Sequence, residues 1–252
     1  MIEPAKMADY KGQAPAVLVY GPSGGGKTYF ATMRIWGRVF VLDFDKGLAT
    51  AKTAPNRGTI EYLPHVSSTP VSWGMTSEIL QFLVQQGKQR YDTVVIDTAT
   101  AAEDNFYDDL VVSQGKTNSD DHRTVYRALK HQMLSMLSDL RKLGLNLVVT
   151  AGDRGIKDKT GNVISIQPDF SGTTSAEAPR AFDEVYYLKC IGARKSGSDP
   201  NGPERPVYKC FTSSDGTFWA KSRWQVPESE DYEFVVSQLM KKLQAAQGPK
   251  AA

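Results

Sequence analysis

Cysteine and histidine are scarce in this sequence, which limits the metal and disulfide chemistry available to it. Cys190 and Cys210 are too few for a disulfide framework and lack metal-ligand spacing, so we expect two buried, reduced thiols. His65 stands alone, while His122 and His131 are nine positions apart and are expected on different faces of a helix. The sequence therefore predicts no histidine metal site.

Long apolar runs are also absent. No segment approaches the roughly 18 residues that a membrane span needs, and the first residues, MIEPAKMADYKGQ, lack the apolar core of a signal peptide. These absences predict a cytoplasmic protein with no membrane partner. With a formal net charge of +2, any affinity for nucleic acid must come from a local basic patch. The 252 residues, 40% of them apolar, are enough for one large globular domain.

The order of apolar segments favours an α/β fold. Apolar runs bounded by turn residues are typical of buried parallel strands, and they occupy residues 16–20, 39–44, 93–96 and 145–150. Segments with helical spacing lie between them, at residues 27–36, 72–86, 101–112 and 122–143. Gly144 stands where the last of these helices should end. Alternating strands and helices predict a mostly parallel central sheet flanked by helices.

After Thr150 the pattern changes to C-terminal antiparallel hairpins. One turn is predicted at residues 158–162, and a second at 213–216 between strands at 207–212 and 217–222. Residues 197–203 are rich in glycine and proline and predict an exposed loop. The expected organisation is a lead segment at 1–13, a core at 14–225, a C-terminal helix within 226–243 and a disordered tail at 244–252.

The sequence GPSGGGKT at residues 21–28 fits the phosphate-binding P-loop pattern, with a predicted strand before it and a predicted helix after it. Its glycines let backbone N–H groups turn toward a phosphate. We expect Lys27 to reach the β- and γ-phosphates and the Thr28 hydroxyl to ligate Mg²⁺. The predicted nucleotide-binding residues are Gly21, Pro22, Ser23, Gly24, Gly25, Gly26, Lys27, Thr28 and Tyr29.

Two other predicted strands end in carboxylates. Val94-Val95-Ile96-Asp97 has the form of a Walker B strand, whose acid holds Mg²⁺ directly or through water; the alternative is that Asp97 only caps the next turn. Asp43 and Asp45 follow residues 39–42, at a strand end where an acid can activate the water that attacks the γ-phosphate. On an extended strand both would point to the same side, so the pattern does not separate them, and a solvated strand end is the alternative.

Four segments in order, GPSGGGKT, VLDFDKGL, VVIDTATA and LNLVVTAGDR, resemble the RecA-like ATPase core. They most closely resemble the short phage-encoded RecA-like nucleotide-binding proteins associated with single-strand annealing. The resemblance covers about residues 14–225 and is most specific in the P-loop and Walker B segments. It implies an ATPase that uses ATP and Mg²⁺, with Lys27 and Asp45 catalytic and with metal contacts from Thr28 and Asp97. Family members often have Glu where Asp45 stands, and the shorter side chain would slow hydrolysis.

The resemblance also implies which segments face nucleic acid. They are residues 112–123 and 154–178, and the second carries the candidate DNA-binding residues Arg154, Lys157 and Lys159. Such a run is enough for a few phosphate contacts, although a solvated turn is the alternative. A polar sensor of the γ-phosphate is implied at the end of the strand at 145–150, where this sequence has Thr150 and Arg154 in place of glutamine.

Residues 189–223 combine basic and aromatic side chains. Lys221 and Arg223 match basic residues that in the family reach the ATP of an adjacent subunit, which implies a trans finger role and a homo-oligomer. The aromatic side chains either stack on bases or pack the sheet. They are Tyr208, Phe211, Phe218, Trp219 and Trp224.

The predicted function is that of an ATP-binding and hydrolysing phage protein that acts on single-stranded DNA in recombination, annealing or replication, in the host cytoplasm. A single-strand binding protein is a further expected partner. One alternative is a non-catalytic, nucleotide-dependent binding module, which the short Asp45 and the missing glutamine favour. A small-molecule kinase is a second alternative, against which stand Asp45 and the lack of an arginine-rich lid.

Overall fold

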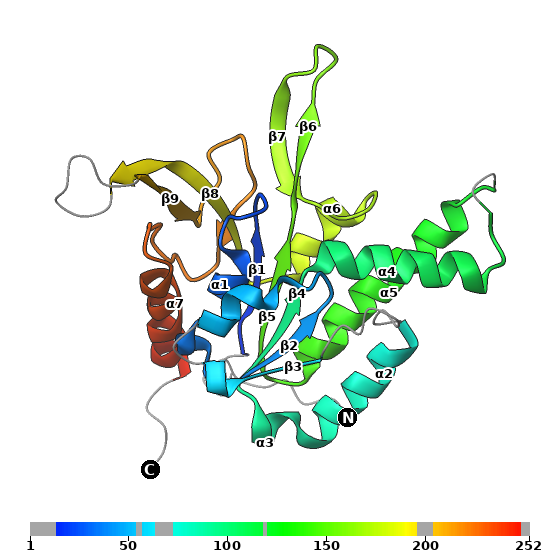
Figure 1. Ribbon diagram of the computed structural model, residues 1–252, viewed down its shortest axis with the longest axis horizontal. Helices are drawn as coiled ribbons and strands as arrows, with labels where there is room; N and C mark the ends of the chain where they lie inside the picture. Colours follow the sequence, from blue (N-terminus) through cyan, green and yellow to red (C-terminus); the bar gives the residue numbers. More distant parts are fainter. Residues whose placement is uncertain (1–13, 54–56, 64–72, 118–119, 196–203, 248–252) are drawn as a thin grey trace, which may run out of the picture.

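The computed structural model describes residues 14–53, 57–63, 73–117, 120–195 and 204–247 (Figure 1). An eight-stranded sheet runs through it in the order β10-β8-β1-β5-β4-β2-β3, with β9 also paired to β8. The strands are β1 Ala16–Tyr20, β2 Val39–Asp43, β3 Ile60–Leu63, β4 Thr93–Asp97, β5 Asn146–Ala151, β8 Glu184–Lys195, β9 Glu204–Phe211 and β10 Lys221–Ser222. Among the described strands of this sheet, only β9 and β10 are antiparallel, both to β8, so the predicted α/β fold with a mostly parallel sheet is confirmed.

Helices cover both faces of this sheet. They are α1 Lys27–Ala31, α2 Trp73–Phe82, α3 Lys88–Arg90, α4 Ala99–Ser113, α5 Arg123–Lys142, α6 Thr174–Glu177 and α7 Tyr232–Gln247. Side chains alternate along β1, so that Leu18 and Tyr20 join the core beneath α2, α4 and α5, while Val17 and Val19 join the core beneath α1 and α7. The continuous apolar runs of the strands follow from this double burial.

The predicted helices at 101–112 and 122–143 are confirmed as α4 and α5, and α5 buries the apolar stripe from Val125 to Leu140. The helix predicted at 27–36 instead divides into α1 and a 3₁₀ turn at Arg34–Trp36. The chain bends between them because the Trp36 indole turns back into the core and donates to the carbonyl oxygen of Phe30 at 2.8 Å. In the segment predicted at 72–86, α2 gives way to a π-helical turn at Leu83–Gly87.

The two hairpin predictions had different outcomes. The turn at 158–162 is confirmed, and it joins β6 Asp153–Lys157 to β7 Val163–Pro168 in a separate two-stranded sheet. The hairpin predicted around 213–216 is wrong, because β9 and β10 each pair with β8 and not with each other. The segment between them crosses to β7, where Ile166 exchanges backbone hydrogen bonds with Thr217 and Trp219.

Several smaller expectations need correction. Cys210 is buried as expected, but Cys190 is exposed. It lies in the second part of β8, which pairs with β9 alone and extends beyond the parallel strands. Helix α7 continues through Gln247, into residues that were expected to be a disordered tail. The predicted lead segment at 1–13, the loop at 197–203 and the last residues, 248–252, lie outside the described residues. Among the described helices, none combines the length and apolar character that a bilayer crossing requires.

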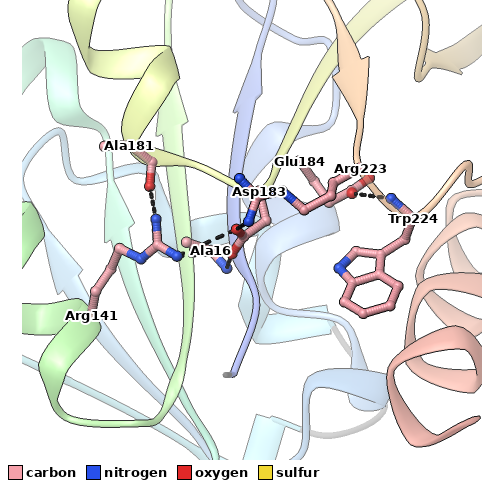
Figure 2. Close-up of polar contacts among 7 residues, drawn as sticks. All are labelled: Ala16, Arg141, Ala181, Asp183, Glu184, Arg223 and Trp224. Atoms are coloured by element: carbon pink, nitrogen blue, oxygen red, sulfur yellow. Dashed lines mark hydrogen bonds and ion pairs between the residues drawn. The ribbon is translucent and has the colours of Figure 1, made fainter. Parts of the chain in front are cut away.

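A buried carboxylate joins several elements at the amino end of the sheet (Figure 2). Asp183, directly before β8, accepts a hydrogen bond from the backbone N–H of Ala16 at 3.1 Å. It also binds Arg141 of α5 at 3.1 Å and Arg223 at 2.6 Å, and its side chain is only 8% exposed. Arg141 in turn donates to the carbonyl oxygen of Ala181. This cluster fixes the starts of β1 and β8 relative to α5.

We predict that Asp183→Ala lowers the free energy of unfolding by about 2–4 kcal/mol, because it leaves Arg141 without its ion-pair partner and the buried backbone N–H of Ala16 without its acceptor. The matched control is Asp139→Ala, since the pair between Asp139 and Lys142 is exposed and should contribute less than about 1 kcal/mol. Urea denaturation measures both. Equal losses in the two variants would contradict this role for Asp183.

Candidate nucleotide-binding site

The glycine-rich loop connects β1 to α1 at the carboxyl end of the parallel strands. Gly21 enters the loop so close to β8 that a Cβ atom would lie 2.2 Å from the carbonyl oxygen of Leu188, which excludes any side chain. Gly24 and Gly26 have φ angles of 74° and 82°, in the left-handed region that favours glycine. The backbone of the loop therefore requires glycine at three of its four glycine positions.

Lys27 begins α1 and folds back over this loop. Its ammonium group donates to the carbonyl oxygens of Gly21 and Pro22, both at 2.8 Å. Burial lowers the pKa of Lys27, and the negative charges of Asp153 and Asp97 partly oppose that shift. A phosphate beside this ammonium group would favour its charged form, so the half-buried position suits anion binding.

A buried hydrogen-bond network connects the loop to the sheet. The Thr28 hydroxyl donates to one carboxylate oxygen of Asp97 at 2.7 Å, and the Thr150 hydroxyl donates to the other. Asp97 is fully buried, and this desolvation raises its pKa to about 6, against the lowering effect of the two hydroxyls. Strand β5 lies between β1 and β4, the strand that ends in Asp97, and Thr150 near the end of β5 spans the gap.

Asp43 and Asp45 take different positions in the structure. Asp43 ends β2 and is buried, whereas Asp45 lies in the following turn and is exposed, so they do not share one extended strand. Both carboxylates accept from the backbone N–H of Gly47, at 3.1 and 2.8 Å. A Cβ atom on Gly47 would lie 3.4 Å from the Thr28 hydroxyl oxygen. The turn that holds both acids therefore packs against the P-loop.

Two residues that the sequence reasoning missed also belong to this site. Asp153 accepts from the Tyr187 hydroxyl at 3.1 Å and is the first of the acids that stabilise the charge on Lys27. Its position just after a predicted strand was an available signal. Tyr232 donates to the carbonyl oxygen of Gly25 at 3.1 Å, and its ring would lie 3.1 Å from a Cβ atom on Gly26. No sequence pattern linked α7 to the loop.

The donor set at the loop suits magnesium. Within the described residues no group of three or more His, Cys, Asp or Glu side chains is placed to hold a metal by itself. The Thr28 hydroxyl and the Asp97 carboxylate are hard oxygen donors in direct contact. Mg²⁺ usually takes one or two protein oxygens together with substrate phosphates and water, so these residues fit it in the presence of a nucleotide.

The three candidate DNA-binding residues lie in two different environments. Hairpin β6–β7 projects from the body of the molecule (Figure 1). Arg154 lies at its base, where it donates to the Ser175 hydroxyl at 2.7 Å and approaches Asp169 at 3.8 Å. Lys157 and Lys159 lie farther along the hairpin and are exposed. The DNA-binding role of all three stays a prediction.

The candidate finger residues lie at the other end of the sheet. Lys221 pairs with Val185 near the start of β8, and Arg223 binds Asp183 (Figure 2). This is the amino end of the parallel strands, opposite the P-loop of the same chain. Most of the aromatic side chains nearby pack against one another. The centroid of the Phe218 ring lies 4.8 Å from that of Tyr187 and 5.0 Å from that of Phe211.

The fold and this loop define the class of the protein. A glycine-rich loop between a parallel strand and a helix, with Lys-Thr at the helix start and a buried acid on a nearby strand end, is the arrangement of a P-loop NTPase. A family model described as an AAA domain matches residues 13–224, and the chain belongs to this family. A comparison with curated proteins finds no match. The chain is therefore a nucleotide-binding protein of the P-loop NTPase class.

The raised pKa of Asp97 predicts a pH dependence of stability. An unfolded Asp titrates near 3.9, so below about pH 6 the folded protein binds a proton that the unfolded chain does not. This group therefore makes the free energy of unfolding rise as the pH falls from 7 toward 5, by about 1–3 kcal/mol in all. Denaturation of wild type and Asp97→Asn at pH 5, 6 and 7 measures it. An unchanged slope in the variant would contradict the assignment.

Proposed function

We propose that this protein is a Mg²⁺-dependent ATPase of the RecA-like kind that acts with single-stranded DNA, in phage recombination, annealing or replication in the host cytoplasm. The observation that carries the catalytic part is the convergence of two acidic strand ends on the P-loop. Asp97 contacts Thr28 directly, and Asp45 is held at Gly47, whose position is in contact distance of Thr28. Phosphate, metal and water chemistry thus share one edge of the sheet.

Each residue has a distinct role in this proposal. Lys27 would stabilise negative charge on the terminal phosphates, and Thr28 and Asp97 would hold a Mg²⁺ ion, which would neutralise further negative charge on them. Asp45 orients the attacking water and takes its proton, which requires a carboxylate that is ionised and accessible. Asp45 is exposed, whereas Asp43 is buried. The accessible acid is therefore our choice for the base.

We predict that Lys27→Ala removes nucleotide binding or turnover, while Asp45→Asn retains binding and lowers turnover by about 100- to 10,000-fold, the range for a general base. Phosphate release and equilibrium ATP binding measure the two effects separately. Asp139→Asn on the exposed face of α5 is the matched acid control. Normal hydrolysis in Asp45→Asn would move the role to Asp43 or to water alone, and Asp43→Asn tests that.

The proposed nucleic-acid contact lies on hairpin β6–β7. This hairpin continues the chain directly after β5, so its base adjoins Thr150 and Asp153 at the nucleotide site. Its distal part carries the exposed side chains of Lys157 and Lys159. Contacts from lysine to phosphate are independent of sequence, which suits a protein that must engage many single-stranded DNA sequences.

We predict that the double substitution Lys157→Ala and Lys159→Ala weakens binding to single-stranded DNA equally for different sequences. Loss of two phosphate contacts should also reduce the salt slope of log K by about 1–2. Fluorescence anisotropy over a range of salt concentrations measures both quantities. Lys241→Ala, at an exposed position of α7, is the control. An unchanged affinity and slope in the double variant would contradict the proposal.

The proposal includes a homo-oligomer. Lys221 and Arg223 lie opposite the P-loop of their own chain, so they could serve a nucleotide only across a subunit boundary. Arg223 is 63% exposed despite its ion pair with Asp183, which leaves its guanidinium within reach of another chain. A single-strand binding protein remains an additional proposed partner.

A non-catalytic binding module is the second candidate, and one observation favours it: the Asp45 carboxylate is already engaged by the N–H of Gly47. Phosphate release measured with and without single-stranded DNA separates the candidates. Stimulation by DNA supports the proposed ATPase, binding without turnover supports the module, and transfer that needs a small-molecule acceptor supports a kinase.

A further inference from the structure

A cavity of about 460 Å³ opens beside the P-loop, on the side away from the catalytic acids. Gly26 and Tyr29 form its P-loop wall, and β9 and the start of α7 form the opposite wall. None of Asp43, Asp45 and Asp97 lines it. A nucleotide with its terminal phosphate toward those acids has its nucleoside at the other end, and this cavity lies on the P-loop side that such a nucleoside would reach. This step rests on the proposed function.

The lining of the cavity suits an aromatic ring system. Tyr29 lies at the edge of the cavity and is 48% exposed. Tyr208 of β9 lines the facing wall with Pro206 and Val207. The ring of Tyr232 closes the cavity next to Gly26 and is itself buried. Flat aromatic side chains of this kind bind bases by stacking.

The rim of the cavity is acidic, which excludes it as a second phosphate site. Asp231 accepts from the backbone N–H groups of Glu233 and Phe234 and so caps α7, while Glu230 binds Arg194 at 3.2 Å. The Glu233 side chain is exposed and lines the cavity. A carboxylate accepts hydrogen bonds only, so it favours a base that offers amino hydrogens.

We propose that this cavity holds the purine base of the bound nucleotide, stacked on Tyr208 and Tyr29, with Glu233 facing its amino group. A larger cavity of about 550 Å³ beyond β2 is the competing location. Three basic residues line that cavity, namely Lys46, Lys52 and Arg57, and it also includes Tyr62, which is 53% exposed. Asp43 also lines it, but that carboxylate already accepts a hydrogen bond from the backbone N–H of Gly47, and the three cations suit an anion better than the amino group of a purine.

The test compares a ligand that has a base with one that has none. Calorimetry measures the Kd of Mg-ATP and of Mg-tripolyphosphate for the wild type, Tyr208→Ala, Tyr208→Phe and Tyr62→Ala. We expect Tyr208→Ala to raise the Kd of ATP about 10-fold, the loss of one stacked base, and to leave that of tripolyphosphate unchanged. Tyr208→Phe keeps the ring and should stay within about 2-fold of the wild type. Tyr62→Ala should change neither Kd.

Each outcome decides a separate point. An unchanged ATP Kd in Tyr208→Ala, or a raised one in Tyr62→Ala instead, would overturn the assignment of the cavity while leaving the ATPase proposal intact. Equal Kd values for ATP and UTP in the wild type would overturn the preference for purines. If the wild type binds neither ATP nor tripolyphosphate, the proposed function fails, and this inference fails with it.

Discussion

The carboxylate of Asp97 lies out of water between two hydroxyl groups, one from Thr28 at the start of α1 and one from Thr150 at the end of β5. Burial makes its charged form costly, which the pKa of about 6 expresses, and the two hydroxyls offset part of that cost. Three elements are tied together at this point: the P-loop, the strand that carries the acid, and the strand between them. The geometry of the nucleotide site depends on this contact, because it joins the start of α1, where the P-loop ends, to the carboxyl ends of β4 and β5.

Such a contact lowers the stability of the folded protein but prepares the carboxylate to bind a cation. A carboxylate that resists ionisation in the folded protein gains from a nearby cation, so Mg²⁺ would relieve the electrostatic cost that burial imposes. The same reasoning applies to Lys27, whose pKa is lowered by burial and which a phosphate would stabilise. The Asp97 carboxylate and the Lys27 ammonium group are thus both partly desolvated at the same site. A bound nucleotide would place a phosphate beside Lys27, and its Mg²⁺ would lie beside Asp97.

The parts of this site that are local in sequence could be predicted from it. The P-loop and Asp97 each lie at the end of a short apolar run, and a parallel strand buried on both faces places its polar residues at its ends, with ligands bound outside the carboxyl ends. Strands β1, β2, β4 and β5 and helices α4 and α5 followed from the same alternation, whereas the edge strand β3 was not predicted. The helix after the P-loop was predicted too long, because periodicity does not register the single indole hydrogen bond that turns Trp36 back into the core.

The parts that depend on distant pairing could not be predicted. Strand β8 organises the second half of the chain by pairing with β1, β9 and β10, and nothing in its own residues marks those partners. The wrong hairpin at 213–216 followed from assuming that neighbouring strands pair. Likewise, the contact of Tyr232 with Gly25 joins residues 207 positions apart. The separation of Lys221 and Arg223 from the P-loop became visible only with the sheet order.

In the proposed function, Thr28 and Asp97 form the metal-binding half of the nucleotide site. The most direct test is the Kd of ATP measured with Mg²⁺ and with EDTA, for the wild type and for Asp97→Asn. We expect Mg²⁺ to tighten ATP binding to the wild type and most of this gain to be lost in the variant. If Mg²⁺ made no difference to the wild type, or tightened binding equally in both proteins, Thr28 and Asp97 would not form a metal site.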